Sequence, residues 1–344
     1  MGVTNLPFKM TVGLMLEVAY WAQNQCSYQA AEDTISKVLG LTINDDTIRS
    51  VTNEIGAIVF NNDCKAAEEA YSKLITGKMS FPRYKKAGTL YIETDGAALN
   101  TRHKDNNGST WRENKLGIVF SSDNIRFWKD KNGDKQHKIN KREYVSYVGC
   151  VAEFQKHLLS CALRNGYGTY EEIVILSDGA TWIRNMKEEL FPDAQQILDF
   201  FHLCENVNTF AKYFFKMDES KYKPWTERIC RELKESKYED VLKELESFGS
   251  IEGKSPINLH SYITNNAKNI DYAAYQQKGY FIGSGAIESG NKIVLQQRLK
   301  QAGMRWNTDT AQHLLTLKSK KESGLWSTDV VSPVIRHYGS FAHC

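Results

Sequence analysis

The chain has 344 residues, of which 25% are charged and 41% hydrophobic, and its formal net charge at pH 7 is +3. This length allows two or three domains with a substantial core, and the composition is that of a globular protein. Because the net charge is small, affinity for nucleic acid has to come from local clusters of basic residues. The seven cysteines form no C-x-x-C pair, which favours a cytosolic protein with reduced thiols and argues against a zinc ribbon or a disulfide framework. The apolar stretch Phe8–Ala22 is interrupted by Lys9 and Glu17, so the sequence predicts no signal peptide and no membrane span.

Residues 1–86 are expected to form a helical N-terminal region. Within this region the sequence predicts a short helix over Tyr28–Leu39, a turn at Gly40, and a second helix over Thr47–Val59 that Asp45 or Asp46 caps. Two short helices joined through a glycine turn are the outline of a helix-turn-helix.

If that outline is a DNA-binding element, four polar side chains of the second helix would face a DNA groove, namely Thr47, Arg49, Ser50 and Asn53. A generic helical pair packed on a catalytic domain explains the same pattern equally well, so both interpretations stay open. The segment Phe81–Lys86 is predicted to be a basic linker to the next part of the chain.

Residues 87–200 have the strand pattern of a mixed α/β domain. Strands are predicted at Thr89–Thr94, Leu116–Phe120 and Glu143–Val148, followed by a helix, Ala152–Leu163. The apolar run Ile173–Leu176 predicts a strand with both faces covered, and a helix and a last strand follow it, Thr181–Leu190 and Gln196–Leu198. Three strands with hairpin-like connections that lead into an α/β crossover favour an RNase H-like mixed sheet, with the first strand beside the one that precedes Asp178.

Two of these strands end in the same triplet, Asp-Gly-Ala, at Asp95 and at Asp178. If the strands are neighbours, two carboxylates meet at one edge of the sheet, and a divalent cation is the usual agent that neutralises such a pair. The alternative is that both are turn aspartates, since Asp-Gly is a common turn dipeptide and Asp178 can cap the following helix.

Residues 201–280 change to polar, charged helices and are predicted to be an all-helical insertion that covers the sheet or grips a polymer. The insertion follows the arrangement Asp199-Phe200-Phe201-His202 at the exit of a strand. His202 could lie near a metal site or a DNA phosphate. Alternatively, Asp199 could hydrogen-bond the imidazole and fix the junction between strand and helix.

Residues 281–325 carry a third acid on a basic helix, and residues 326–344 are predicted to be a tail. Ser284 can cap a helix from Ala286 to about Gln301, on which Glu288 shares a stripe with Leu295 and Leu299. The helix and its continuation concentrate basic residues around one aromatic, which suits phosphates and a stacked base: Lys292, Arg298, Lys300, Arg305, Trp306 and Lys318. Stabilisation by the helix dipole explains Glu288 without catalysis, and a solvated face explains any single basic residue.

Asp95, Asp178 and Glu288 occur in the order D, D, E, with a helical insertion between the second and third. This order, together with the phrases SDGATWIR, LDFFH, GSGAIES and RLKQAGMRW, resembles the DDE transposases of bacterial insertion sequences. The similarity is to the Mutator-like group, which carries a C/D-x-x-H motif after the second aspartate, and it runs from about Pro7 to Trp326.

The resemblance implies an RNase H-like fold, a metal-binding catalytic triad of Asp95, Asp178 and Glu288, and Asp199 with His202 as the signature pair. Members of that group usually extend further at the amino end. We therefore expect a transposase that cleaves and joins double-stranded DNA at the terminal inverted repeats of its element. It would use two Mg²⁺ or Mn²⁺ ions about 3.5–4 Å apart.

The expected protein is cytoplasmic and nucleoid-associated, does not bind membranes, and forms a dimer or larger assembly on DNA, because two ends have to meet. Two alternatives remain: a domesticated or degenerate transposase that only binds DNA, and an RNase H-like nuclease or resolvase. A glycosidase with paired carboxylates is more remote, since its chemistry does not call for the basic segment Arg298–Trp306.

Overall fold

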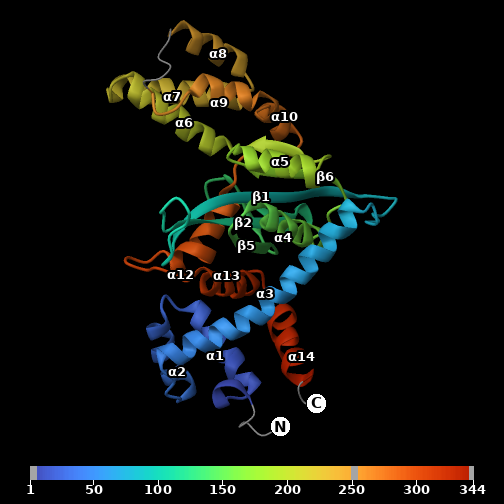
Figure 1. Ribbon diagram of the computed structural model, residues 1–344. Helices are drawn as coiled ribbons and strands as arrows, with labels where there is room; N and C mark the ends of the chain where they lie inside the picture. The colour runs from blue at the N-terminus through green and yellow to red at the C-terminus, as the bar shows by residue number, and fades with distance from the viewer. Residues whose placement is uncertain (1–5, 249–254, 341–344) are drawn as a thin grey trace. The chain divides into compact units, whose positions relative to one another are not determined.

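The computed structural model describes residues 6–248 and 255–340 of the chain (Figure 1). The chain divides into two compact units. Unit 1 contains Met1–Leu90, Thr94–Glu171 and Ala286–Cys344, and unit 2 contains Tyr91–Glu93 and Glu172–Gly285. The fold is mixed α/β, as the sequence predicts.

Five strands form a mixed sheet in the order β5-β2-β1-β6-β7. Their bounds are β1 (Lys86–Asn100), β2 (Trp111–Ser121), β5 (Glu143–Val148), β6 (Tyr170–Ser177) and β7 (Gln195–Leu198). The β2–β5 pair is antiparallel, with Asn114 opposite Val148, and the β6–β7 pair is parallel, with Ser177 opposite Leu198. β1 and β6 are adjacent, as the sequence predicts.

A separate two-stranded hairpin, β3 (Ile125–Lys129) and β4 (Lys135–Ile139), was not predicted. It encloses a turn at Asn132-Gly133, where Gly133 has φ +85°. Most of its side chains are exposed, so it lacks the alternating apolar pattern that identifies a half-buried strand.

β1 is longer than the predicted strand and does not end at Asp95-Gly96. It continues to Asn100, because pairing with β2 outweighs the local turn preference of an Asp-Gly dipeptide. Thr94 donates its hydroxyl to the Leu116 carbonyl at 3.1 Å, and the Thr101 amide donates to the Thr110 carbonyl at 2.8 Å. Asp95 is therefore a residue within a strand.

The N-terminal helices of unit 1 and the C-terminal ones share a hydrophobic core (Figure 1). They are α1 (Val12–Asn24), α2 (Tyr28–Leu39), α3 (Asp45–Ile75), α13 (Thr308–Glu322) and α14 (Ser332–Ser340), with a π-helical segment, Trp326–Val331, before α14. The core includes Val18, Ile48, Val51, Leu317 and Val334. Helical structure therefore continues past residue 326, in the segment that was predicted to be a tail; residues 341–344 lie outside the described residues.

The predicted bounds of α2 are confirmed, and Gly40 ends it with φ +65°. α3 differs from the predicted helix at both ends. Its N-cap is Asn44, whose Oδ1 accepts the Thr47 amide at 2.8 Å, and it continues to Ile75. A Cβ at Gly56 would lie 2.6 Å from the His313 Cβ, so this glycine permits the close approach of α3 and α13.

Unit 2 is mostly helical, and no helix among the described residues has the length and apolarity needed to cross a membrane. Its helices are α5 (Thr181–Leu190), α6 (Phe200–Phe214), α7 (Glu219–Lys234), α8 (Tyr238–Ser247), α9 (Leu259–Asn265) and α10 (Tyr272–Gln277). Asp218 caps α7 and accepts the Ser220 amide at 3.1 Å, so this helix begins before Pro224.

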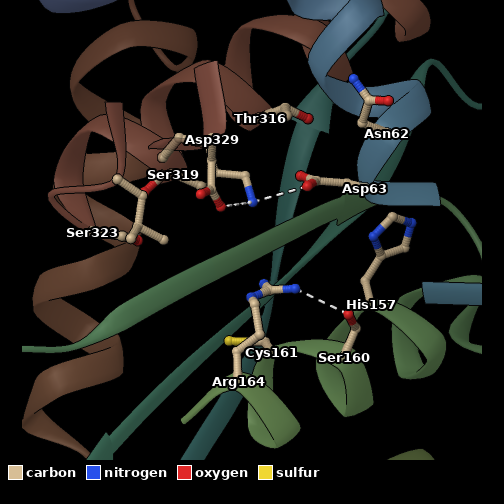
Figure 2. Close-up of polar contacts among 12 residues, drawn as sticks. Asn62, Asp63, His157, Ser160, Cys161, Arg164, Thr316, Ser319, Ser323 and Asp329 are labelled. Carbon is tan, nitrogen blue, oxygen red and sulfur yellow. Dashed lines mark hydrogen bonds and ion pairs between the residues drawn. The ribbon is translucent and has the colours of Figure 1, made fainter. Parts of the chain in front are cut away.

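A cluster of charged side chains that includes the buried Lys320 lies in unit 1 between α3, α4 (Val151–Arg164) and α13 (Figure 2). Lys320 of α13 is 4% exposed and forms ion pairs with Asp63 at 2.9 Å and Asp329 at 3.1 Å. Burial alone would lower the pKa of Lys320, but the two carboxylates outweigh it and raise this pKa. Arg164 of α4 donates its Nε to Glu143 of β5 at 3.0 Å. The pairs of Lys320 thus connect α3 with the C-terminal helices, and the pair of Arg164 connects α4 with β5.

Candidate functional site

Asp95 lies beside the helical segment that carries Glu288. The Asn291 side chain donates its Nδ2 to the Asp95 Oδ2 at 2.6 Å, and the Gly96 amide donates to the Asp95 Oδ1 at 2.7 Å. Asn291 is 196 residues away from Asp95 in sequence and only three residues after Glu288. Within unit 1, folding therefore brings the first and third predicted acids to neighbouring elements.

The helical segment after Gly285 is not a regular α-helix. It consists of α11 (Gly285–Gly290), a π-helical segment (Asn291–Gln296) and α12 (Gln297–Leu299). Gly290 lets it approach the sheet, since a Cβ there would lie 2.8 Å from Tyr144 Cε1 of β5. π-turns inside helices are rare and are frequently found at functional sites.

The π-helical segment changes which way Glu288 faces. The sequence predicts that Glu288 shares the apolar face of Leu295 and Leu299, and this prediction is wrong: both leucines are buried, but Glu288 is exposed. The wider turn between residues 291 and 296 shifts the helical phase, so counting at 3.6 residues per turn fails. An exposed carboxylate is accessible to a ligand, which a core-facing one is not.

A fourth acid, Glu113 of β2, lies next to Gly96 and was missed. A Cβ at Gly96 would lie 2.2 Å from Glu113 Oε1, so the glycine makes room for this carboxylate. Lys115 is 3% exposed and donates its Nζ to Glu113 Oε2 at 2.6 Å and to the Gly149 carbonyl at 2.8 Å. The signal in the sequence was the polar triplet Glu113-Asn114-Lys115, which is unusual inside a strand whose other residues are mostly apolar.

Asp178 belongs to unit 2, at the end of β6. Its Oδ1 accepts the Ala180 amide at 2.9 Å, which is the turn role of the alternative interpretation, but the predicted cap is wrong, because the N-cap of α5 is Ala180 and no side chain caps it. Gly179 has φ +85°, and a Cβ there would lie 2.8 Å from Leu198 and 3.0 Å from Asn266 Oδ1. One Asp178 oxygen thus fixes the loop, and the carboxylate remains partly exposed.

Tyr262 of α9 is a second residue that sequence reasoning missed. Its hydroxyl donates to the backbone carbonyl of Asp178 at 2.8 Å. Burial raises the pKa of Tyr262, and the charge of Asp178 raises it further, so the phenol stays protonated at neutral pH. The helical insertion therefore supports the loop that carries the second acid.

Asp199 joins three segments of unit 2. Its Oδ1 accepts the amides of Phe201 at 2.6 Å and His202 at 2.9 Å, which caps α6. Its Oδ2 accepts the Ser284 amide at 2.7 Å and also the Ser284 hydroxyl. Asp199 is 2% exposed, so these bonds satisfy a buried carboxylate. Asp199 thus ties the start of the helical insertion to the segment that follows its end.

We expect Asp199→Ala to lower the free energy of unfolding by about 2–4 kcal/mol, from the lost cap and the buried donors left unpaired. Chemical denaturation of the purified protein measures this loss. Asp218→Ala is the matched control, since Asp218 caps α7 from a more exposed position and its loss should cost less. Equal losses in the two variants would contradict the role of Asp199 as a buried junction.

His202 does not follow the interpretation in which Asp199 hydrogen-bonds its imidazole. Asp199 accepts the backbone amide of His202 instead, and the interpretation that places the imidazole near a metal site or a DNA phosphate stays a prediction. The His202 Nδ1 lies 3.8 Å from the Glu205 carboxylate, and the side chain is 42% exposed. The Asp-x-x-His spacing thus reflects a helix cap with an accessible imidazole one turn into α6.

The basic residues separate into exposed and buried groups. Lys292, Lys300 and Arg305 are exposed, as DNA contacts require. Arg298 is 1% exposed and Trp306 is 8% exposed, so the prediction that both meet a DNA strand at the surface is wrong. Arg298 donates to the carbonyls of Ala22 and Cys26, both at 3.2 Å, and Trp306 donates its Nε1 to the Leu299 carbonyl at 3.0 Å. Lys318 is also buried, at 4%.

Of the residues predicted to read a DNA groove, Arg49 is exposed and Thr47 is half-buried. Arg49 forms an ion pair with Asp46 at 2.8 Å. Asn53 instead points into the helix packing, where its Oδ1 lies 2.8 Å from His313 Nδ1 of α13. This contact fits the alternative in which the helical pair packs on other elements.

One protein-family model matches most of the chain. The sequence model described as "Uncharacterised protein family (UPF0236)" matches residues 12–330. The chain belongs to this family. The match contains Asp95, Asp178 and Glu288 and parts of both units. A search of curated proteins finds no match.

The side chains around Asp95 can be compared with the ligands that a metal ion needs. Among residues 6–248 and 255–340, no three or more His, Cys, Asp or Glu side chains gather as a metal site. The chemistry of the donors nevertheless fits a hard cation, which prefers carboxylate and amide oxygens. Asn291 is 4% exposed, and its Oδ1 is buried without a hydrogen-bond partner beside Asp95, so an oxygen acceptor here is unsatisfied.

Proposed function

We propose that this UPF0236 protein is a DDE-type transposase that cleaves and joins DNA at the ends of a mobile element. The observation that carries the proposal is the 2.6 Å hydrogen bond from Asn291 to Asp95. It brings the segment with Glu288 to the strand with Asp95, as a triad of dispersed acids requires. If Asp95 and Asp178 were only turn residues, a contact between Asp95 and Asn291 would not be expected.

The strand order supports the inclusion of Asp178. β1 carries Asp95 and is adjacent in the sheet to β6, which ends one residue before Asp178. This adjacency is what an RNase H-like sheet requires, and we propose that fold for the sheet. Open sheets bind ligands beyond the carboxyl ends of their strands, where Asp178 lies on β6.

In this proposal Asp95, Asp178 and Glu288 would hold two Mg²⁺ or Mn²⁺ ions, which would supply activation of water or a 3′-hydroxyl and stabilisation of the leaving oxygen. Asn291 orients the Asp95 carboxylate, and Tyr262 fixes the backbone of the Asp178 loop through its hydroxyl. No protein nucleophile is required, in agreement with the absence of a recognisable Ser/His or Cys/His signature in the sequence.

The substrate we propose is double-stranded DNA with terminal inverted repeats, bound by a dimer or larger assembly. Lys292, Lys300 and Arg305 are exposed and available for phosphates. Lys292 follows Glu288 by four residues, so phosphate contacts and the proposed carboxylate site lie on the same helical segment.

Cleavage of labelled duplexes tests the proposal. We expect Mg²⁺-dependent nicking at the terminal repeats that flank the reading frame, faster than on a random duplex of equal length, and no product with EDTA. Equal cleavage of both duplexes would instead identify an RNase H-like nuclease. Binding without cleavage in Mg²⁺ and in Mn²⁺ would identify a protein that only binds DNA.

A further inference from the structure

A cavity of about 570 Å³ in unit 1 is separate from the three acids. It is lined by residues at the start of α2 and the start of α3, by Arg102 beyond the end of β1, and by the loop between α12 and α13. Its volume is within the range of small-ligand sites. The residues that determine its chemistry are Tyr28, Arg49, Arg102, Arg298, Arg305 and Trp306.

The charge of the cavity is strongly positive. Four arginines line it, and the carboxylate among the lining residues is that of Asp45. Arg49 is paired with Asp46, which lies outside the lining. Among the described residues, Arg102, Arg298 and Arg305 form no ion pair with a carboxylate, so their charge is available to an anion.

Arg298 is a buried charge without a counter-ion. Its Nε and Nη1 donate to backbone carbonyls, but its Nη2 is buried with no hydrogen-bond partner. The guanidinium carbon lies 4.5 Å from the centroid of the Tyr28 ring and 5.3 Å from that of Trp306. Buried charges are normally paired, because leaving one unpaired is costly. An anion in the cavity would supply the missing compensation.

The loop that forms one wall is held in place by backbone bonds. The Trp306 amide donates to the Asn100 carbonyl at 3.1 Å, and the Arg102 amide donates to the Trp306 carbonyl at 2.8 Å. Thr101 and Trp306 form a parallel β-bridge at the end of β1. Arg102 and Arg305 are thus carried on a fixed backbone, which reduces the entropy lost when they bind a ligand.

We propose that this cavity binds a nucleotide unit, with its phosphate on the exposed Arg102 and Arg305 and its base against a planar guanidinium group, beside the buried charge of Arg298. Guanidinium forks match phosphate oxygens in a bidentate way and also stack on flat rings. The nucleotide is either free or the unpaired end of a DNA strand. We favour the strand end, and for that choice alone the assignment rests on the proposed function.

The test is fluorescence polarisation in EDTA, which removes any contribution from divalent cations. The probe is a fluorescein-labelled duplex with a single-stranded overhang, compared with its blunt-ended counterpart. We expect tighter binding of the overhang. Arg305→Gln should weaken binding of the overhang about tenfold. It should also reduce the slope of log affinity against log salt concentration by about one, the value for one lost phosphate contact. Arg126→Gln, an exposed arginine on β3 with the same change of charge, should leave it unchanged.

Competitors distinguish the two sources of the nucleotide. Displacement of the overhang by deoxyadenosine monophosphate at low concentration identifies a free-nucleotide site, and displacement only by single-stranded DNA identifies a strand-end site. Equal loss in Arg305→Gln and Arg126→Gln, or no preference for the overhang, overturns the proposal. Cleavage plays no part in this assay. If the protein binds the overhang but never cleaves DNA, the proposed transposase function is wrong, and the proposal of a nucleotide site still holds.

Discussion

Asp178→Asn is expected to abolish Mg²⁺-dependent cleavage of element ends while leaving DNA binding intact. An amide is a poor ligand for a divalent cation compared with a carboxylate. The loss of several kcal/mol of charge stabilisation corresponds to about three orders of magnitude or more in rate. The asparagine Oδ1 can still accept the Ala180 amide, so the loop should keep its shape. Single-turnover cleavage of a labelled end measures the rate.

Asp193→Asn provides the matched control for this variant. Asp193 lies in unit 2 and is exposed in the loop before β7, and its replacement makes the same chemical change. We expect it to cleave at the parental rate. If Asp178→Asn retained that rate, Asp178 would be a turn residue only, and the assignment of the triad would be wrong.

Lys320→Ala is expected to lower the free energy of unfolding by about 3 kcal/mol. The substitution leaves Asp63 and Asp329 facing each other's charge without the cation between them, and breaking a buried ion pair costs about 3–5 kcal/mol. The two carboxylates are about one quarter exposed, which places the loss at the lower end. Denaturation in urea at neutral pH measures it.

Two further variants separate charge from packing. Lys320→Met keeps most of the buried methylene volume and removes the charge, so we expect it to lose nearly as much stability as Lys320→Ala. Lys73→Ala removes an exposed ion pair with Glu69 and should change little. A stable Lys320→Met protein would show that packing, and not the ion pairs, stabilises this cluster.

Local signals in the sequence were sufficient for most elements. Tyr28–Leu39, Glu143–Val148 and Thr181–Leu190 were predicted to the residue, because caps, turns and apolar periods within each segment define their ends. The adjacency of β1 and β6 followed from the order of the elements along the chain. Local patterns and the order of the elements therefore predicted the α/β class and the adjacency of β1 and β6.

The errors concern contacts between residues distant in sequence. Arg298 looked like a surface cation because its acceptors, the carbonyls of Ala22 and Cys26, come more than 270 residues earlier. Asp95 looked like a strand end because only pairing with β2 shows that β1 continues. The Asp95–Asn291 hydrogen bond could not be predicted from composition or spacing. Nor could the burial of Arg298, Trp306 and Lys318 be predicted from the basic segment alone.

The π-helical turn at Asn291–Gln296 has a consequence for the ancestry of the chain. Such a turn contains one residue more than the α-helical turn it replaces, as if a single codon had been inserted into an older, regular helix. In a regular helix an inserted residue would rotate everything before it by about 100° relative to everything after it, and the wider turn absorbs that rotation. A relative that lacks this codon would therefore hold its glutamate on the same side of the segment, with one residue fewer between it and the buried leucines, and this difference in spacing would mark the two lineages.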